Sequence, residues 1–187
     1  MKIKLFAALI IGAVFSFGVS AQDITTNGVT FPAKLKIGND MTEYNGSGLR
    51  TKYFIKLYVA ALYLPNKSKD AQAIIDQDET SAVRLKILSN RVTRERFIET
   101  VRDGFATSTE GKATQAEIDQ LMGLFNTEFK AGDDIILAYR PSQGIEVYMN
   151  GKRLGSVKGL EFKKALWGIW LGEKPADSSV KAGMLGG

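Results

Sequence analysis

The strongest strand signal in the chain runs from Tyr53 to Leu64. Alternate residues of a strand point to opposite faces of its sheet, and here both alternating sets are largely apolar. This pattern is typical of a strand inside a sheet that is covered on both sides. Further strands are predicted at 29–37, where Pro32 favours an edge or a bulge, and at 82–88.

Helical periodicity dominates the middle of the chain. Apolar residues recur with the spacing of one helix face in two stripes, which are Phe97, Ile98, Val101 and Phe105, and then Ile118, Leu121, Met122, Phe125 and Phe129. Thr114, followed three residues later by Glu117, forms a capping box at the start of the second helix. A shorter helix is predicted at 70–76.

The C-terminal third predicts three strands followed by two helices. The strands, at 135–139, 145–149 and 153–157, are separated by turn sequences. The second turn, Asn150-Gly151, is a strong type I′ hairpin signal. Helices follow at 160–171 and at 178–185, the latter with Asp177 as its cap. This order of elements predicts an α+β fold, with a mainly antiparallel sheet and helices packed on one face.

The N-terminus has the three parts of a secretory signal peptide. Met1 to Lys4 is basic, Leu5 to Val19 is apolar, and Val19-Ser20-Ala21 places small residues at a cleavage site. A transmembrane anchor is the alternative, but the apolar run is only marginally long enough to span a bilayer. We therefore expect a signal peptide at 1–21, cleavage after Ala21, and one periplasmic or secreted domain at 22–187.

The composition excludes several classes of function. The net charge of +5 falls to +3 when Lys2 and Lys4 leave with the signal peptide, and the remaining charges are dispersed, so no nucleic-acid partner is expected. The chain has no Cys and no His, which excludes lipoprotein anchoring, Ser-His-Asp triads and Cys-His pairs. Zinc, copper and haem sites lose their usual ligands. We expect no metal, no cofactor and no stable membrane anchor.

Two polar residues near the long strand are candidates for a binding site. On one straight strand Arg50 and Tyr58 would lie roughly 26 Å apart. A tight hairpin near Phe54 would instead make them cross-strand neighbours, about 5 Å apart, and could form a carboxylate site. The residues Lys52-Tyr53-Phe54 include no Gly, Pro or Asn to favour such a turn, whereas 44–48 is flexible and turn-prone in character.

Several segments resemble the chalcone isomerase-like domain family. The similar segments are Asn45-Gly46-Ser47-Gly48-Leu49-Arg50-Thr51-Lys52, then 54–64, then Trp167-Gly168-Ile169-Trp170-Leu171-Gly172-Glu173-Lys174-Pro175, with parts of 178–186. The resemblance runs from about Val29 to Gly186 and is strongest to bacterial exported members. It implies an open-faced β-sandwich, in which helices lie on a large antiparallel sheet above a ligand cleft.

The family contains isomerases, which close a chalcone to a flavanone, and fatty-acid-binding proteins, which include plant members. The resemblance implies an anion-binding role for Arg50 in both groups, and Tyr58 matches the fatty-acid binders. Phe97 and Gly104 match positions where isomerases carry Tyr and Asn. Ser178 or Ser179 matches a substrate-contacting Ser or Thr.

The resemblance therefore favours a non-catalytic binder of a fatty acid or similar apolar carboxylate, with no catalytic residue. Arg50, Tyr58, Ser178 and Ser179 are the candidate ligand contacts. The candidate pocket wall consists of Phe54, Leu62, Phe97, Val101, Phe105 and Trp167. Two alternatives remain open at this point: an isomerase or intramolecular lyase acting on an unknown substrate, and an interaction protein that holds no small ligand.

Overall fold

The centre of the fold is a seven-stranded sheet in which each strand pairs antiparallel with the next in sequence. The structure is a computed structural model that describes residues 22–187, so the signal peptide expected at 1–21 lies outside the described residues. The strands of the sheet are β3 (Lys34–Ile37), β4 (Asp40–Lys52), β5 (Ile55–Leu64), β6 (Ser81–Ile87), β7 (Asp134–Arg140), β8 (Gly144–Met149) and β9 (Lys152–Val157).

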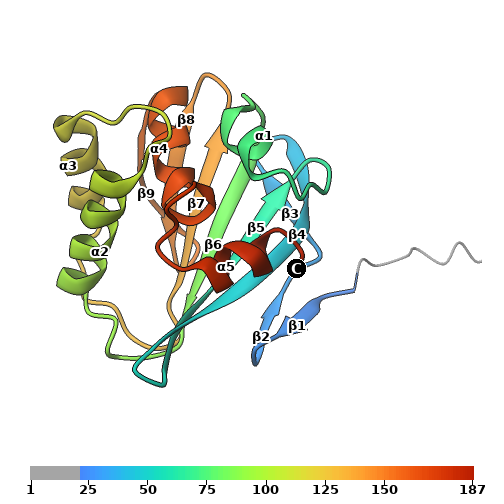
Figure 1. The fold of residues 1–187 in the computed structure, drawn as a ribbon, viewed down its shortest axis with the longest axis vertical. Coiled ribbons are helices and arrows are strands. Elements are labelled where there is room, and N and C mark those ends of the chain that lie inside the picture. Colours follow the sequence, from blue (N-terminus) through green and yellow to red (C-terminus); the bar gives the residue numbers. More distant parts are fainter. Residues whose placement is uncertain (1–21) are drawn as a thin grey trace, which may run out of the picture.

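Helices cover one face of the curled sheet, as Figure 1 shows. They are α1 (Ala71–Asp76), α2 (Arg94–Thr107), α3 (Gln115–Leu124), α4 (Leu160–Leu171) and α5 (Ser178–Met184). The predicted capping box at Thr114 is present, and Asp177 caps α5 as expected. The larger hydrophobic core lies between these helices and the sheet. The predicted α+β fold is confirmed.

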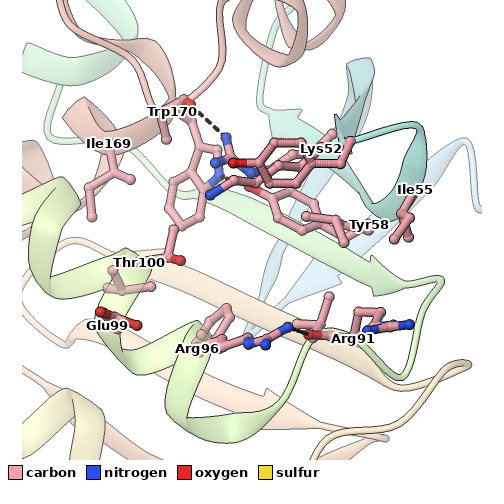
Figure 2. A pocket seen from close by; sticks show the side chains of 16 residues that line it. Lys52, Ile55, Tyr58, Arg91, Arg96, Glu99, Thr100, Ile169 and Trp170 are labelled. Atoms are coloured by element: carbon pink, nitrogen blue, oxygen red, sulfur yellow. Dashed lines mark hydrogen bonds between the residues drawn. The ribbon is translucent and has the colours of Figure 1, made fainter.

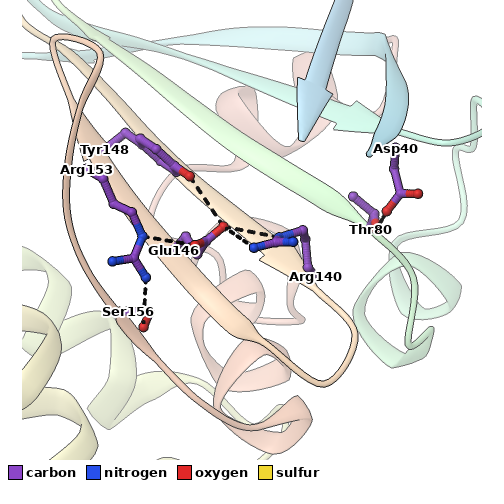
Figure 3. Close-up of polar contacts among 7 residues, drawn as sticks. All are labelled: Asp40, Thr80, Arg140, Glu146, Tyr148, Arg153 and Ser156. Atoms are coloured by element: carbon purple, nitrogen blue, oxygen red, sulfur yellow. Dashed lines mark hydrogen bonds and ion pairs between the residues drawn. The ribbon is translucent and has the colours of Figure 1, made fainter. Parts of the chain in front are cut away.

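The opposite face is only partly covered. A hairpin of β1 (Ile24–Thr26) and β2 (Val29–Phe31) lies over a smaller core that includes Phe31 and Tyr63. Further along this face the side chains are polar. Glu146 accepts hydrogen bonds from Arg140, Arg153 and Tyr148 there (Figure 3). The sandwich is therefore open on this side.

The prediction of a central, doubly covered strand is confirmed by β5. It lies between β4 and β6, and its residues alternate between the two cores. Tyr58 and Leu62 face the helices, whereas Val59 and Tyr63 face the β1–β2 hairpin. The Asn150-Gly151 turn also forms as predicted, with φ of 51° and 79°.

Two local predictions were wrong. Residues 44–48 form part of β4, not a flexible turn. The glycines there allow a close approach of α5: a Cβ at Gly48 would lie 2.4 Å from the Cα of Val180, and one at Gly46 would lie 2.3 Å from the carbonyl oxygen of Gly183. In addition, α3 ends at Leu124, so Phe129 is not helical, although its side chain is buried against Phe97.

Candidate functional site

A two-residue turn at Tyr53 and Phe54 connects β4 to β5. Both residues have positive φ, 50° and 64°, as a type I′ turn requires. The turn pairs Lys52 with Ile55, and further along the ladder it places Arg50 directly opposite Tyr58. Of the two arrangements that the sequence left open, the structure therefore has the hairpin. Side chains of a directly opposed pair lie on the same face of the sheet.

A cavity of about 470 Å³ lies between this hairpin and α2, and α4 contributes to its wall. Its apolar lining consists mainly of Leu57, Val92, Phe97, Val101, Ile169 and Trp170. Four cations, Arg50, Lys52, Arg91 and Arg96, and one carboxylate, Glu99, also line it. In Figure 2, Arg91 and Arg96 lie across the cavity from Tyr58 and Lys52. The volume and the mixture of apolar walls with a few polar groups are typical of small-molecule sites.

Arg50 is held in place by the segment that leads into α5. Its guanidinium donates a hydrogen bond to the carbonyl oxygen of Ala176, with an Nη1–O distance of 2.5 Å. The same nitrogen lies 3.7 Å from a carboxylate oxygen of Asp177, the residue that caps α5. The Arg50 side chain is 16% exposed. Asp177 therefore occupies part of the space around the cation that an external carboxylate would use.

Tyr58 presents a neutral hydroxyl beside this cation. The indole nitrogen of Trp170 donates to the hydroxyl oxygen at 3.3 Å. Within residues 22–187 the hydroxyl finds no acceptor for its own proton. Burial raises the pKa of Tyr58 above its ordinary value, and the positive charge of Arg50 only partly offsets this effect. The phenol is therefore protonated at neutral pH, with a hydrogen-bond donor to spare.

The predicted wall residues divide into two groups. Phe97 and Val101 line the cavity. The remaining four lie elsewhere, and their assignment is corrected: Leu62 and Trp167 are fully buried in the core, Phe105 packs against Phe162, and Phe54 is fully exposed at the hairpin tip. For Leu62, Trp167 and Phe105 the reason is that an apolar residue on a covered strand or helix fills the core unless its rotation turns it towards a gap. Phe54 instead lies in the turn itself and is left exposed.

The two serines also lie apart from the cavity. Ser178 and Ser179 are exposed in the first turn of α5, and neither lines the cavity. The hydroxyl of Ser179 donates to Asp177 at 2.6 Å and so belongs to the helix cap. It is the preceding residues, Ala176 and Asp177, that reach Arg50.

Some lining residues were missed by sequence reasoning. Trp170, not Trp167, contacts Tyr58, although both lie on α4 three positions apart. The two tryptophans give the same sequence signal on one helix, so Trp170 was as good a candidate for the cavity wall as Trp167. Arg91 and Arg96 carry no local signal that distinguishes them from other surface cations, and only the fold brings them to the cavity.

The arrangement can bind an anion with an apolar body, since a cation and a free donor meet at the wall of an apolar cavity. Of the two positions that the resemblance matched to polar residues of the isomerases, Phe97 has no hydroxyl, and Gly104 has no side chain and does not line the cavity. Within residues 22–187 there is no cluster of three Asp or Glu side chains that could hold a metal ion. No helix in this range has the length and hydropathy to cross a bilayer.

Comparisons with known proteins bear on the family and the fold. Among curated proteins, none matches the chain. Among solved structures, a fatty-acid binding protein of Arabidopsis thaliana has a similar fold, with a TM-score of 0.71 and 20% sequence identity over 88% of this chain and 96% of that chain. A family model described as chalcone isomerase-like matches residues 23–186. With nearly the whole described range matched, the chain belongs to the chalcone isomerase-like family.

Proposed function

We propose that this protein binds a fatty acid or a similar apolar carboxylate in the cavity, without catalysing a reaction. The observation that carries the proposal is the opposed pair of Arg50 and Tyr58 at the wall of a cavity of about 470 Å³ lined largely by apolar side chains. The fatty-acid binding protein with the same fold supports the proposed class of ligand.

The burial of the lining residues suggests how the ligand would lie. Tyr58, Ile169 and Trp170 are buried, whereas Lys52, Tyr53 and Ile55 are exposed at the hairpin end. In the proposed complex the carboxylate binds Arg50 and the Tyr58 hydroxyl at the inner end. The acyl chain runs along Leu57 and Val101 towards the exposed end.

The energies are sufficient for such a complex. Burial of each CH₂ contributes about 0.8 kcal/mol, so a dozen contribute roughly 10 kcal/mol before the costs of association. A charge-assisted hydrogen bond adds about 1.5–3 kcal/mol. The acyl chain therefore provides most of the affinity, and the head group fixes the orientation.

Catalysis of the chalcone isomerase type is disfavoured by two positions. Phe97 lines the cavity without a hydroxyl. At Gly104 an added Cβ would lie 2.7 Å from Cγ2 of Ile169, so an Asn side chain could not be placed there without a shift of the Ile169 side chain. The chain thus retains the anion-binding Arg50 of the family pattern without the two further polar groups.

Titration calorimetry with palmitic acid and with hexadecanol tests the proposal. We expect Arg50→Ala to weaken binding of the acid by one to two orders of magnitude and to weaken the alcohol much less. Tyr58→Phe should cost less, because only a neutral donor is lost. Circular dichroism of each variant controls for the Arg50 contacts with Ala176 and Asp177. Equal affinities of the wild type for acid and alcohol would rule out the proposed head-group site.

We also propose that the mature protein starts at Gln22 and is located in the periplasm or outside the cell. It is supported by the tripartite signal sequence at 1–21. N-terminal sequencing of the exported protein is the test, and a retained, membrane-embedded N-terminus would contradict this location.

A further inference from the structure

The tip of the β4–β5 hairpin exposes a cluster of large hydrophobic side chains. Tyr53 is 83% exposed, Phe54 102% and Ile55 37%. The hairpin extends beyond the rest of the sheet in Figure 1. Within residues 22–187, the one other large hydrophobic side chain with comparable exposure is Met41, at 53%, at the opposite end of β4. Three of the four exposed large hydrophobic side chains within residues 22–187 are thus gathered at one projecting point.

Folding does not account for aromatic residues in this turn. Tyr53 and Phe54 have φ of 50° and 64°, a left-handed conformation that is unfavourable for bulky side chains. The β8–β9 hairpin of the same protein uses Asn150 and Gly151 for nearly the same angles. An Asn-Gly pair is the preferred sequence for such a turn. The two aromatic residues therefore make the turn less favourable and contribute no core contact in return.

Basic side chains surround this tip. Lys52 and Lys56 flank the turn and are exposed, and Arg91 and Arg96 are exposed on the adjoining rim of the cavity. Across residues 22–187, none of these four cations has a carboxylate within 4.0 Å, whereas ten other ion pairs are formed elsewhere. Glu99 is the one acidic residue that lines the cavity. The surface combines protruding aromatic groups with unpaired positive charge.

We propose that this hairpin tip docks the protein on a phospholipid bilayer that contains anionic lipids. Aromatic side chains favour the boundary between head groups and acyl chains, and cations near it are attracted to anionic head groups. Aromatic residues and arginines also occur at protein interfaces, but lysines are depleted there, so Lys52 and Lys56 favour a lipid surface over a protein partner. Docked in this way, the tip would insert Phe54 and Tyr53, while Lys52 and Lys56 contact lipid phosphates.

This orientation would turn the cavity towards the bilayer. Lys52, Tyr53 and Ile55 belong both to the tip and to the cavity lining. An apolar ligand could then pass between lipid and cavity without crossing water. The docking itself does not depend on the proposed fatty-acid binding, and either could fail without the other.

Vesicle flotation tests the proposal. The purified mature protein is mixed with vesicles of phosphatidylcholine alone or of phosphatidylcholine with phosphatidylglycerol. We expect binding to the anionic vesicles that weakens as salt rises towards about 1 M. Phe54→Ser should weaken it by about ten- to a hundred-fold, and Lys56→Gln by about five-fold. Met41→Ser removes an exposed hydrophobic residue far from the tip and should have no effect.

A second variant separates docking from folding. Tyr53→Asn/Phe54→Gly installs the preferred turn sequence, so it should raise the melting temperature while it abolishes vesicle binding. A wild-type protein that does not bind anionic vesicles, or binds neutral ones equally well, would overturn the proposal. So would Phe54→Ser binding at wild-type strength, or sedimentation showing that the tip instead holds two copies of the chain together.

Discussion

Asp177 lies 3.7 Å from Arg50 and at the same time caps α5, accepting hydrogen bonds from the backbone N–H groups of Ser179 and Val180. The carboxylate that completes the helix is thus also the internal partner of the proposed ligand-binding cation. A ligand carboxylate would have to share Arg50 with it.

Asp177→Asn separates these two roles, because Asn is as good an N-cap as Asp but carries no charge. We expect this variant to bind palmitic acid about three- to ten-fold more tightly than the wild type, with hexadecanol unaffected. Titration calorimetry measures the affinities for palmitic acid and for hexadecanol. Weaker binding of the acid would mean that Asp177 supports the ligand and does not compete with it.

The chain should not cyclise chalcones at a useful rate. Loss of a positioned donor at a developing charge costs about 10²- to 10³-fold, and Phe97 and Gly104 together remove two. A spectrophotometric assay with a hydroxylated chalcone, compared with the spontaneous reaction, is the measurement. Rapid cyclisation that disappears in Arg50→Ala would contradict this prediction.

Gly48→Ala should destabilise the protein by about 1–3 kcal/mol, as overpacking does. The added methyl group would overlap the backbone of Val180, which lies 2.4 Å from the Cβ position. Gly123→Ala is the matched control, since nothing lies within 4 Å of its Cβ position in α3. There we expect a gain of about 0.5–1 kcal/mol from helix propensity. Urea denaturation of the wild type and both variants measures these changes in the free energy of unfolding.

Lys163 is a buried residue whose ammonium group holds the end of α1. It is 1% exposed and donates to the carbonyl oxygens of Ile74, Ile75 and Gln77 at 2.7–2.9 Å. Lys163→Met would leave these acceptors without partners, so we expect a loss of about 2–4 kcal/mol. Lys164→Met, at the more exposed neighbouring position, should cost much less, because exposed ion pairs contribute little. Equal effects in thermal unfolding would show that the buried contacts are not required.

Glu146 should make the fold sensitive to acid. Burial raises its pKa, but hydrogen bonds from Arg153 and Arg140 outweigh burial, so the net shift is downward (Figure 3). A carboxyl group with a lowered folded pKa stabilises the protein above its unfolded pKa, about 4.3, and loses this contribution as pH falls through the folded value.

Glu146→Gln should therefore be less stable than the wild type at pH 7, and the two should converge as the pH falls below about 4. Unfolding followed as a function of pH provides the measurement. Glu128→Gln, at an exposed position, is the control and should follow the wild type throughout.

The elements of the fold were largely predictable because their signals are local. Alternation along β5, the capping box at Thr114 and the Asn150-Gly151 turn each act within a few residues. The prediction of a flexible turn at 44–48 rested on Gly46 and Gly48, and it failed for a physical reason. A residue type that favours turns also permits close packing, and only the position of α5, more than 120 residues later in the chain, decides between the two.

The candidate site was less predictable. The pairing of Arg50 with Tyr58 depends on a turn whose residues, Tyr53 and Phe54, have no preference for it. On α4, Trp167 and Trp170 differ by about 60° around the helix axis, and the rotation of the helix on the sheet selects which one reaches the cavity. The sequence pattern carries no information on that rotation.

The hydrogen bond from Arg50 to Ala176 joins residues that are 126 positions apart. Contacts across so long a loop form late, because the entropy of closing the loop must be overcome first. A chain still being synthesised has β4 and β5 long before it has α5. In the proposed complex the ligand would therefore be held only by a finished molecule, and ligand retention would report that the last segment of the protein has folded into place.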